Sequence, residues 1–142
     1  MGSKKYKCFI STPESVEDIA EQFREMVKKR KNHMNFRLKK TTKKDECDLV
    51  LVYCPIVSLP GYDIEATLNK INTEFSNKMV ILIVLHHTFD PEIIVSDSST
   101  FVGSKVSLTV DCLFHEDQGL LKCKRNSEAA RKVKKFLRSE KP

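Results

Sequence analysis

The sequence predicts an α/β fold: a three-layer sandwich around a five-stranded, mainly parallel sheet with strand order 2-1-3-4-5. Two segments, Asp48–Cys54 and Met79–Leu85, are nearly continuous apolar runs, as in strands that helices cover on both faces. Segments with the 3.6-residue hydrophobic period of helices alternate with the predicted strands. This alternation predicts right-handed crossovers and therefore a mainly parallel sheet.

The first three elements are predicted to be a strand, a helix and a second strand. Tyr6–Ser11 is the first strand. Thr12-Pro13-Glu14 then favours a helix start, because a hydroxyl cap, a proline and an acidic residue suit the first turn. The helix that follows has its apolar residues at helical spacing and ends in the basic run Lys28–Lys31. Asn35–Thr41 alternates weakly, which is typical of a half-exposed edge strand.

The second half of the chain is predicted to hold two helices and the last strand. An amphipathic helix begins after Pro60 and Gly61 and carries apolar residues at helical spacing as far as Phe75. Residues 106–114 alternate between apolar and polar, which indicates another edge strand. A final helix is expected to begin at about Ser127 and to bury its apolar stripe beneath a basic face.

The strand order follows from placing the two weakly alternating strands at the edges and the apolar runs inside, which gives the flavodoxin-like order.

Two connections have unusual lengths. The link from Thr41 to Cys47 is short for a crossover, so a single helical turn is expected around Thr42–Glu46, with Thr42 as its cap. The connection 86–104 is long and polar, and its only candidates for a short buried helix are residues 93–95.

Length and cysteine content predict one domain in a reducing compartment. The 142 residues suit a single domain, 1–142, with residues 1–4 disordered and 139–142 frayed. The five cysteines are an odd number in a chain whose start has no secretion signal, which favours reduced thiols. The longest apolar run is too short to span a bilayer. We therefore expect a cytoplasmic protein without a transmembrane segment.

The net charge of +6 is unevenly distributed. Residues 1–46 and 122–142 are strongly basic, with net charges of +6 and +7, whereas residues 47–121 carry −7. Many of these acidic residues follow predicted strands, at the edge where open parallel sheets bind ligands. The overall charge therefore does not by itself predict a polyanion ligand at that edge.

The predicted ligand edge collects polar residues from four strand ends. The segment Ser11–Glu14 has no glycine and places an acid at the helix start, which disfavours a phosphate cradle and therefore flavin mononucleotide. No cofactor is predicted. A small molecule or a protein is the expected ligand of this edge, whose candidate residues are Ser11, Thr12, Ser58, Tyr62, His86, His87, Asp90 and His115.

The histidines of this edge could face a ligand crevice or contribute to a metal site. Consecutive strand residues point to opposite faces, so at most one of His86 and His87 faces a ligand crevice. A metal site built from either one with His115, Asp90 and Glu116 is compatible with neighbouring strands. The nearest pattern to zinc-ligand spacing is Cys112-x-x-His115 with Cys123 further on, and ordinary thiols are favoured there, so no metal is predicted.

The last predicted helix carries a basic face. Most such faces are solvated surfaces, and no aromatic residues lie among these charges to stack on bases. Contact with nucleic acid or an anionic membrane is predicted, if anywhere, through this face, which comprises Arg131, Lys132, Lys134, Lys135 and Arg138.

The segment 47–68 resembles Toll/interleukin-1-receptor (TIR) domains and nucleoside deoxyribosyltransferases. The resemblance rests on a hydrophobic strand, the string Pro55-Ile56-Val57-Ser58, and Gly61-Tyr62-Asp63-Ile64-Glu65 opening a helix. Cys8-Phe9-Ile10-Ser11 is likewise similar to the first TIR strand. In those families a glutamate near the start of this helix serves N-glycosidic bond cleavage, and the resemblance places Glu65 in that role. A second carboxylate, Asp63 or Asp90, could act as its partner, as paired carboxylates do in glycoside hydrolysis.

Strings along nearly the whole chain also resemble a small uncharacterised vertebrate, fish-type, α/β protein family. They are Asp63-Ile64-Glu65-Ala66, the segment 85–91 and the segment 110–117. This resemblance implies a shared fold and carries no activity over.

Two functions therefore stay open. The first is a non-enzymatic recognition or protein-interaction module. The alternative is a nucleoside or NAD N-glycosidase, or a deoxyribosyltransferase-like enzyme, that uses Glu65. An acid in a first helical turn also stabilises the helix dipole without any catalytic role, which favours the first function.

Overall fold

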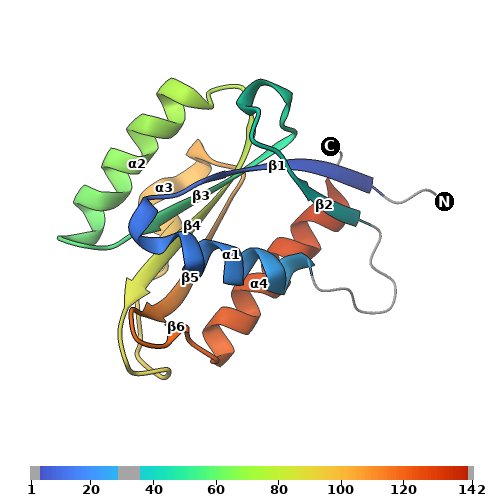
Figure 1. Ribbon diagram of the computed structural model, residues 1–142. Coiled ribbons are helices and arrows are strands. Elements are labelled where there is room, and N and C mark those ends of the chain that lie inside the picture. Colours follow the sequence, from blue (N-terminus) through green and yellow to red (C-terminus); the bar gives the residue numbers. More distant parts are fainter. Residues whose placement is uncertain (1–3, 29–35, 141–142) are drawn as a thin grey trace.

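Six strands form a single sheet in the computed structural model, which describes residues 4–28 and 36–140 (Figure 1). The order is β2-β1-β3-β4-β5-β6, and all neighbours pair in parallel except β5 and β6. The α/β class and the flavodoxin-like order of the first five strands are thus confirmed. The strands are β1 Lys4–Ser11, β2 Phe36–Lys40, β3 Leu49–Pro55, β4 Met79–His87, β5 Leu108–His115 and β6 Gly119–Leu120.

Helices cover both faces of the sheet. One face packs against α1 and α4, and the other packs against α2 and the short α3. Leu51 of β3 faces the first layer and its neighbour Val52 faces the second, and both are fully or almost fully buried. This two-sided burial is the reason that β3 and β4 lack polar alternation. The helices are α1 Glu17–Lys28, α2 Pro60–Glu74, α3 Ser99–Val102 and α4 Lys124–Ser139, with single turns η1 Glu14–Val16, η2 Lys44–Glu46 and η3 Gly103–Lys105.

The sixth strand, β6, corrects the prediction that β5 forms an edge. The chain turns back after β5 and pairs antiparallel with its end, through Phe114 with Leu120 and His115 with Gly119. Gly119 has a φ of 74°, a conformation that glycine adopts without a steric penalty. The side chain of Gln22 on α1 accepts the N–H of Leu120 at 2.7 Å and so ties the short strand to the helix layer.

The two unusual connections agree with prediction only in part. The single helical turn expected before β3 is present as η2, but Thr42 does not cap it; instead the Thr41 hydroxyl accepts the N–H of Lys43 at 3.1 Å. In the long connection the short helix is α3. Residues 93–95 do not form it, since Ile94 is 91% exposed. The side chain of Asp97 accepts the N–H of Ser99 and thereby favours the helical turn at that point.

The ends of the predicted elements agree with the structure to within a few residues. Helix α4 begins at Lys124, before the predicted Ser127. The basic run after Lys28 lies outside the described residues, as do residues 1–3 and 141–142. Lys4 is already the first residue of β1, and Ser139 is the last residue of α4. Among the described helices, none has both the length and the hydropathy needed to cross a membrane.

Candidate functional site

A crevice of about 470 Å³ lies at the carboxyl ends of β3, β4 and β5, beside η1 and the start of α1. Because β1 and β3 lead their connections to opposite faces of the sheet, this is the region where the strand order reverses and where ligands of such sheets bind. Its polar lining residues are Ser15, Asp18, His87 and Glu116. It is lined by Ser15, Val16, Asp18, Ile19, Pro55, Ile56, Val57, His87, Phe114 and Glu116.

Two histidines meet at this crevice. His87 Nε2 lies 2.6 Å from Glu116 Oε2, and its ring stacks on that of His115 with centroids 4.7 Å apart. His115 is 3% exposed, and the exposed Phe89 stacks on it in turn. The structure thus brings together two of the predicted edge residues, because β4 and β5 are neighbours and end at the same level.

The donor atoms of His87, His115 and Glu116 all lie within 4.8 Å of one another. Imidazole and carboxylate form a donor set that zinc and related ions accept. These donors already have protein partners, however, since His115 Nδ1 accepts the N–H of Asp117 at 3.1 Å and His87 is paired with Glu116. Each residue of the cluster therefore has a hydrogen-bond partner within the protein.

His86 takes part in a separate, buried hydrogen-bond network. Its Nε2 lies 2.8 Å from Asp111 Oδ1, and Ser98 donates to the same carboxylate through its hydroxyl at 2.5 Å and its N–H at 3.1 Å. Burial raises the pKa of Asp111, but the hydrogen bonds from His86 and Ser98 outweigh it and hold that pKa below its usual value. The network fixes the long connection to the sheet.

Asp111 and Ser98 were not predicted as functional residues. The available signal was a charged residue, Asp111, between Val110 and Cys112 in a strand with otherwise apolar neighbours. A buried carboxylate needs hydrogen-bond partners, so its position already called for donors from another segment.

Asp63 fixes the loop between β3 and α2. Its Oδ2 accepts the N–H groups of Val57 and Ser58 at 2.8 and 2.9 Å, and the Ser58 hydroxyl donates to Oδ1 at 3.3 Å. The carboxylate therefore holds the loop against the first turn of α2, and Ser58 belongs to the same contact.

Glu65 lies on another side of α2, in a groove of about 630 Å³ between α2 and α3. Its side chain is exposed and makes no hydrogen bond or ion pair within the described ranges. Tyr62 lines the same groove and is 74% exposed. Glu65 and Tyr62 therefore share one surface, which is distinct from the histidine crevice.

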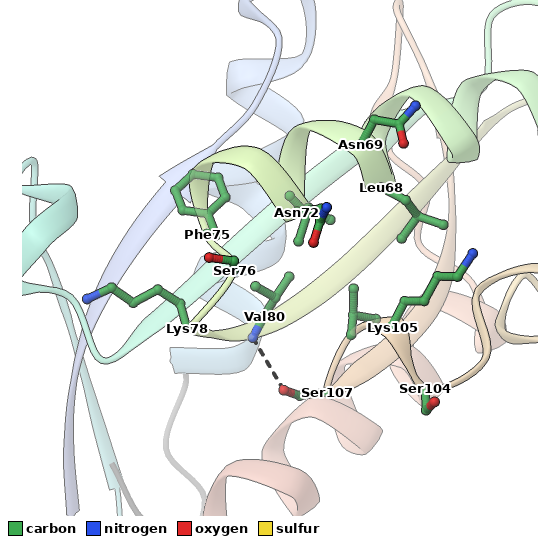
Figure 2. Close-up of a pocket in the computed structure, with 12 residues that line it drawn as sticks. Leu68, Asn69, Asn72, Phe75, Ser76, Lys78, Val80, Ser104, Lys105 and Ser107 are labelled. Atoms are coloured by element: carbon green, nitrogen blue, oxygen red, sulfur yellow. Dashed lines mark hydrogen bonds between the residues drawn. The ribbon is translucent and has the colours of Figure 1, made fainter.

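A second cavity, of about 560 Å³, continues this groove along α2 toward its carboxyl end (Figure 2). The two cavities share Leu68, Asn69 and Lys105. Val80 of β4 lines the second cavity, and its N–H donates to the Ser107 hydroxyl oxygen at 3.3 Å. The groove is open because the β4–β5 connection, although long, supplies only the single turns α3 and η3 on this face, where most crossovers supply a full helix.

The remaining predicted edge residues, Ser11, Thr12 and Asp90, lie apart from the crevice and from the groove. Ser11 is buried, and the hydroxyl of Thr12 donates to the Pro13 carbonyl at 3.1 Å. Asp90 forms a turn in which its Oδ1 accepts the N–H of Glu92. These residues shape loops, and the described structure does not bring them to Glu65.

The basic face of α4 points away from the sheet. Ala130, Val133 and Leu137 pack inward, while Arg131, Lys132, Lys135 and Arg138 are exposed and Lys134 is partly buried.

Large exposed apolar side chains gather in the two connections that leave β3 and β4. Three of them line the groove beside Glu65: Leu59 and Phe101 are 63% and 51% exposed, and Tyr62 is the third. In the part of the chain that the structure describes, all large exposed apolar residues fall in these connections and the helices that follow them: Val57, Leu59, Tyr62, Phe89, Ile93, Ile94 and Phe101.

Comparison with known proteins adds two structures of low similarity. No family model matches the chain, and no curated protein matches it. Two mutants of the flavo di-iron protein from Thermotoga maritima align over 96% of this chain at 10% identity, with TM-scores of 0.40 and 0.38. The chain spans about a third of the length of those proteins, covering 36% and 35% of them.

Proposed function

We propose that the protein is a non-enzymatic recognition module of the cytoplasm, which binds a helical segment of a protein partner in the groove between α2 and α3. The observation that carries this proposal is the group Leu59, Tyr62 and Phe101, three exposed apolar side chains along one groove. Exposed apolar groups that line a shared groove mark interaction sites, whereas isolated ones do not.

The charges of the groove define the partner further. Glu65 lies beside the apolar group without a partner among the described residues, and the other charged residue that lines the groove is Lys105 of η3. An amphipathic helix with apolar residues at helical spacing and a Lys or Arg beside them would complement this surface. Such a helix would lie where a helical β4–β5 crossover would place its own.

Peptide selection tests this proposal. A library of random helical peptides is panned against the protein, and the affinity of selected peptides is measured by calorimetry. We expect enrichment of amphipathic sequences with basic residues. Replacing anchors of a desolvated patch commonly costs at least 2 kcal/mol, so Tyr62→Ser/Phe101→Ser should weaken binding roughly thirtyfold. The matched control is Ile94→Ser, an exposed apolar residue outside the groove, which should bind as the wild type does.

The alternative, N-glycosidic bond cleavage by Glu65, has one supporting observation. Glu65 and Tyr62 line the same cavity, so a carboxylate and an aromatic ring are both available to a ribosyl substrate. Asp63 is poorly suited to act as a second catalytic carboxylate, because both of its oxygens accept hydrogen bonds from the loop. Incubation of concentrated protein with NAD and a panel of nucleosides, beside Glu65→Gln, decides the matter: no turnover by the wild type contradicts catalysis on those substrates.

A further inference from the structure

Four cations lie together on one face of β1 and β2. The parallel register sets them in two directly opposed pairs, Lys5 with Arg37 and Lys7 with Lys39. All four side chains are exposed. We call this set the basic sheet face; it comprises Lys5, Lys7, Arg37 and Lys39.

The basic sheet face lies on the side of the sheet that carries α2, and α2 does not reach it. Tyr6 and Leu38, which alternate with the four cations, are buried in the opposite layer with α1 and α4. Helix α2 packs over β3 and β4 and lies away from β2 (Figure 1). Within the described residues, this part of the sheet is therefore exposed on that side, and its exposed side chains are cationic.

The arrangement is unfavourable for the protein alone. Like charges that are directly opposed across two strands destabilise a sheet. Within residues 4–28 and 36–140, none of the four side chains has a hydrogen bond or an ion pair. The nearby carboxylate of Asp48 accepts the backbone N–H of Lys7 at 2.9 Å, not its ammonium group.

Cations on the other face of the same strands do have partners. Lys4 donates to the carbonyls of Arg138 and Glu140 at the end of α4, and Lys40 Nζ lies 3.6 Å from Glu21 of α1. The lack of partners is thus a property of the basic sheet face and not of lysine in these strands.

We propose that the basic sheet face binds the phosphate backbone of a nucleic acid duplex. Strand geometry places the backbone positions that carry these charges about 4.8 Å apart across the pair and about 6.7 Å apart along each strand, so several cations can meet the closely spaced charges of a duplex at once. Contacts of this kind neutralise phosphates and select no sequence.

Two other ligands suit the surface less well. Single-stranded nucleic acid is usually held by exposed aromatic rings, and none of the four residues is aromatic. Membrane surfaces are bound most firmly where apolar side chains insert beside the cations, and the large exposed apolar residues of the described chain lie between Val57 and Phe101, on other elements. A duplex needs only the charges.

Fluorescence anisotropy with a labelled DNA duplex of mixed sequence tests the proposal. Each phosphate contact contributes about −0.9 to the slope of log K against log salt, so four contacts predict a slope of about −3.6 and a loss of roughly 100-fold between about 50 and 200 mM salt. Lys7→Gln/Lys39→Gln should halve the slope and weaken binding about tenfold at the lower salt concentration. An unlabelled duplex of different sequence should compete equally well.

Two controls keep the result interpretable. Arg131→Gln/Lys132→Gln removes the same charge from α4 and should leave the affinity within about twofold of the wild type. Thermal unfolding should show Lys7→Gln/Lys39→Gln to be at least as stable as the wild type, because it removes an opposed like-charge pair. Lost binding then cannot come from lost folding.

Three outcomes would overturn the proposal. The first is no duplex binding by the wild type at the lower salt concentration. The second is an equal loss in both double variants, which would indicate an effect of net charge alone. The third is binding to phosphatidylserine vesicles, but not to the duplex, that depends on Lys7 and Lys39, which would assign the surface to membranes.

Discussion

The carboxylate of Asp111 joins β5 to β4 and to the connection between them, with His86 Nε2 2.8 Å from one of its oxygens. Ser98, from the end of that connection, donates twice to the same group. The network therefore holds three segments with one charged side chain that is 8% exposed. Losing a buried, hydrogen-bonded charge of this kind is costly, because the partners are left without a counterpart.

The stability contributed by Asp111 should decrease at acidic pH. Its pKa is lower in the folded than in the unfolded state, so this stability is fully present above the unfolded pKa of about 3.9 and is lost as the pH falls through the folded value. Asp111→Asn should lower the free energy of unfolding by about 2 kcal/mol at neutral pH. The difference from the wild type should become smaller below about pH 4. Urea titrations across this pH range measure both; a constant difference at every pH would contradict the assignment.

Asn126 should be among the most sensitive positions of the fold. It is fully buried, accepts the N–H of Leu113 at 2.7 Å and donates to the carbonyls of Leu113 and Leu121. Asn126→Asp replaces the donor with an acceptor and should cost at least about 3 kcal/mol in chemical denaturation. Asn126→Ala removes all three of these hydrogen bonds to backbone groups. Wild-type stability in Asn126→Asp would show that the contacts to the two carbonyls contribute nothing.

Gly119 and Gly103 form a matched pair of positions for alanine substitution. Both have positive φ, 74° and 61°, but Gly103 combines it with a ψ of −134°, outside the left-handed helical region, so the backbone cost of an alanine differs between them. At Gly119 a Cβ would also approach Gln22 Oε1 to 2.7 Å, the atom that accepts the N–H of Leu120, whereas at Gly103 it would meet nothing within 4 Å, so Gly103→Ala reports backbone strain alone. Gly119→Ala should therefore destabilise by about 2 kcal/mol, of which roughly 1 kcal/mol is backbone strain. A cost of no more than roughly 1 kcal/mol in thermal unfolding would mean that the contact with Gln22 is unimportant.

One cysteine should react with thiol reagents well before the others. Cys8, Cys47, Cys54 and Cys112 are buried, and burial raises the pKa of Cys8 to about 12, so little of its reactive thiolate forms near neutral pH. Cys123 is partly exposed. Titration of the native protein with Ellman's reagent should release about one equivalent quickly, and the Cys123→Ser variant should lose that phase. A fast phase that persists in the variant would contradict the burial of the other thiols.

The sequence predicted the fold most successfully where burial is two-sided. The apolar runs at β3 and β4 identify central strands because helices cover both of their faces, and the edge position of β2 followed from its weak alternation. The short strand β6 was not predictable in this way. Its two residues form a strand only because β5 and the Gln22 side chain meet them, and both contacts join distant parts of the chain.

The candidate site shows the same limit. Asp63 and Glu65 lie two positions apart at the start of one helix, and the sequence pattern treats them alike. In the structure the Asp63 carboxylate holds the preceding loop, and Glu65 lines the groove with no partner among the residues that the structure describes. The position of α3 likewise depends on Ser98 reaching Asp111, a contact across the long connection that no local pattern encodes.

The side chains of Lys4 and Tyr6 bond the carbonyls at the end of α4, and these bonds join residues more than 130 positions apart. Closing so long a loop has a large entropic cost, which nearby contacts must first reduce. β1 is an interior strand between β2 and β3, so it must be in place before these bonds can form. During synthesis, β1 leaves the ribosome long before α4 exists, and the first element of the chain is therefore among the last to gain its full set of contacts.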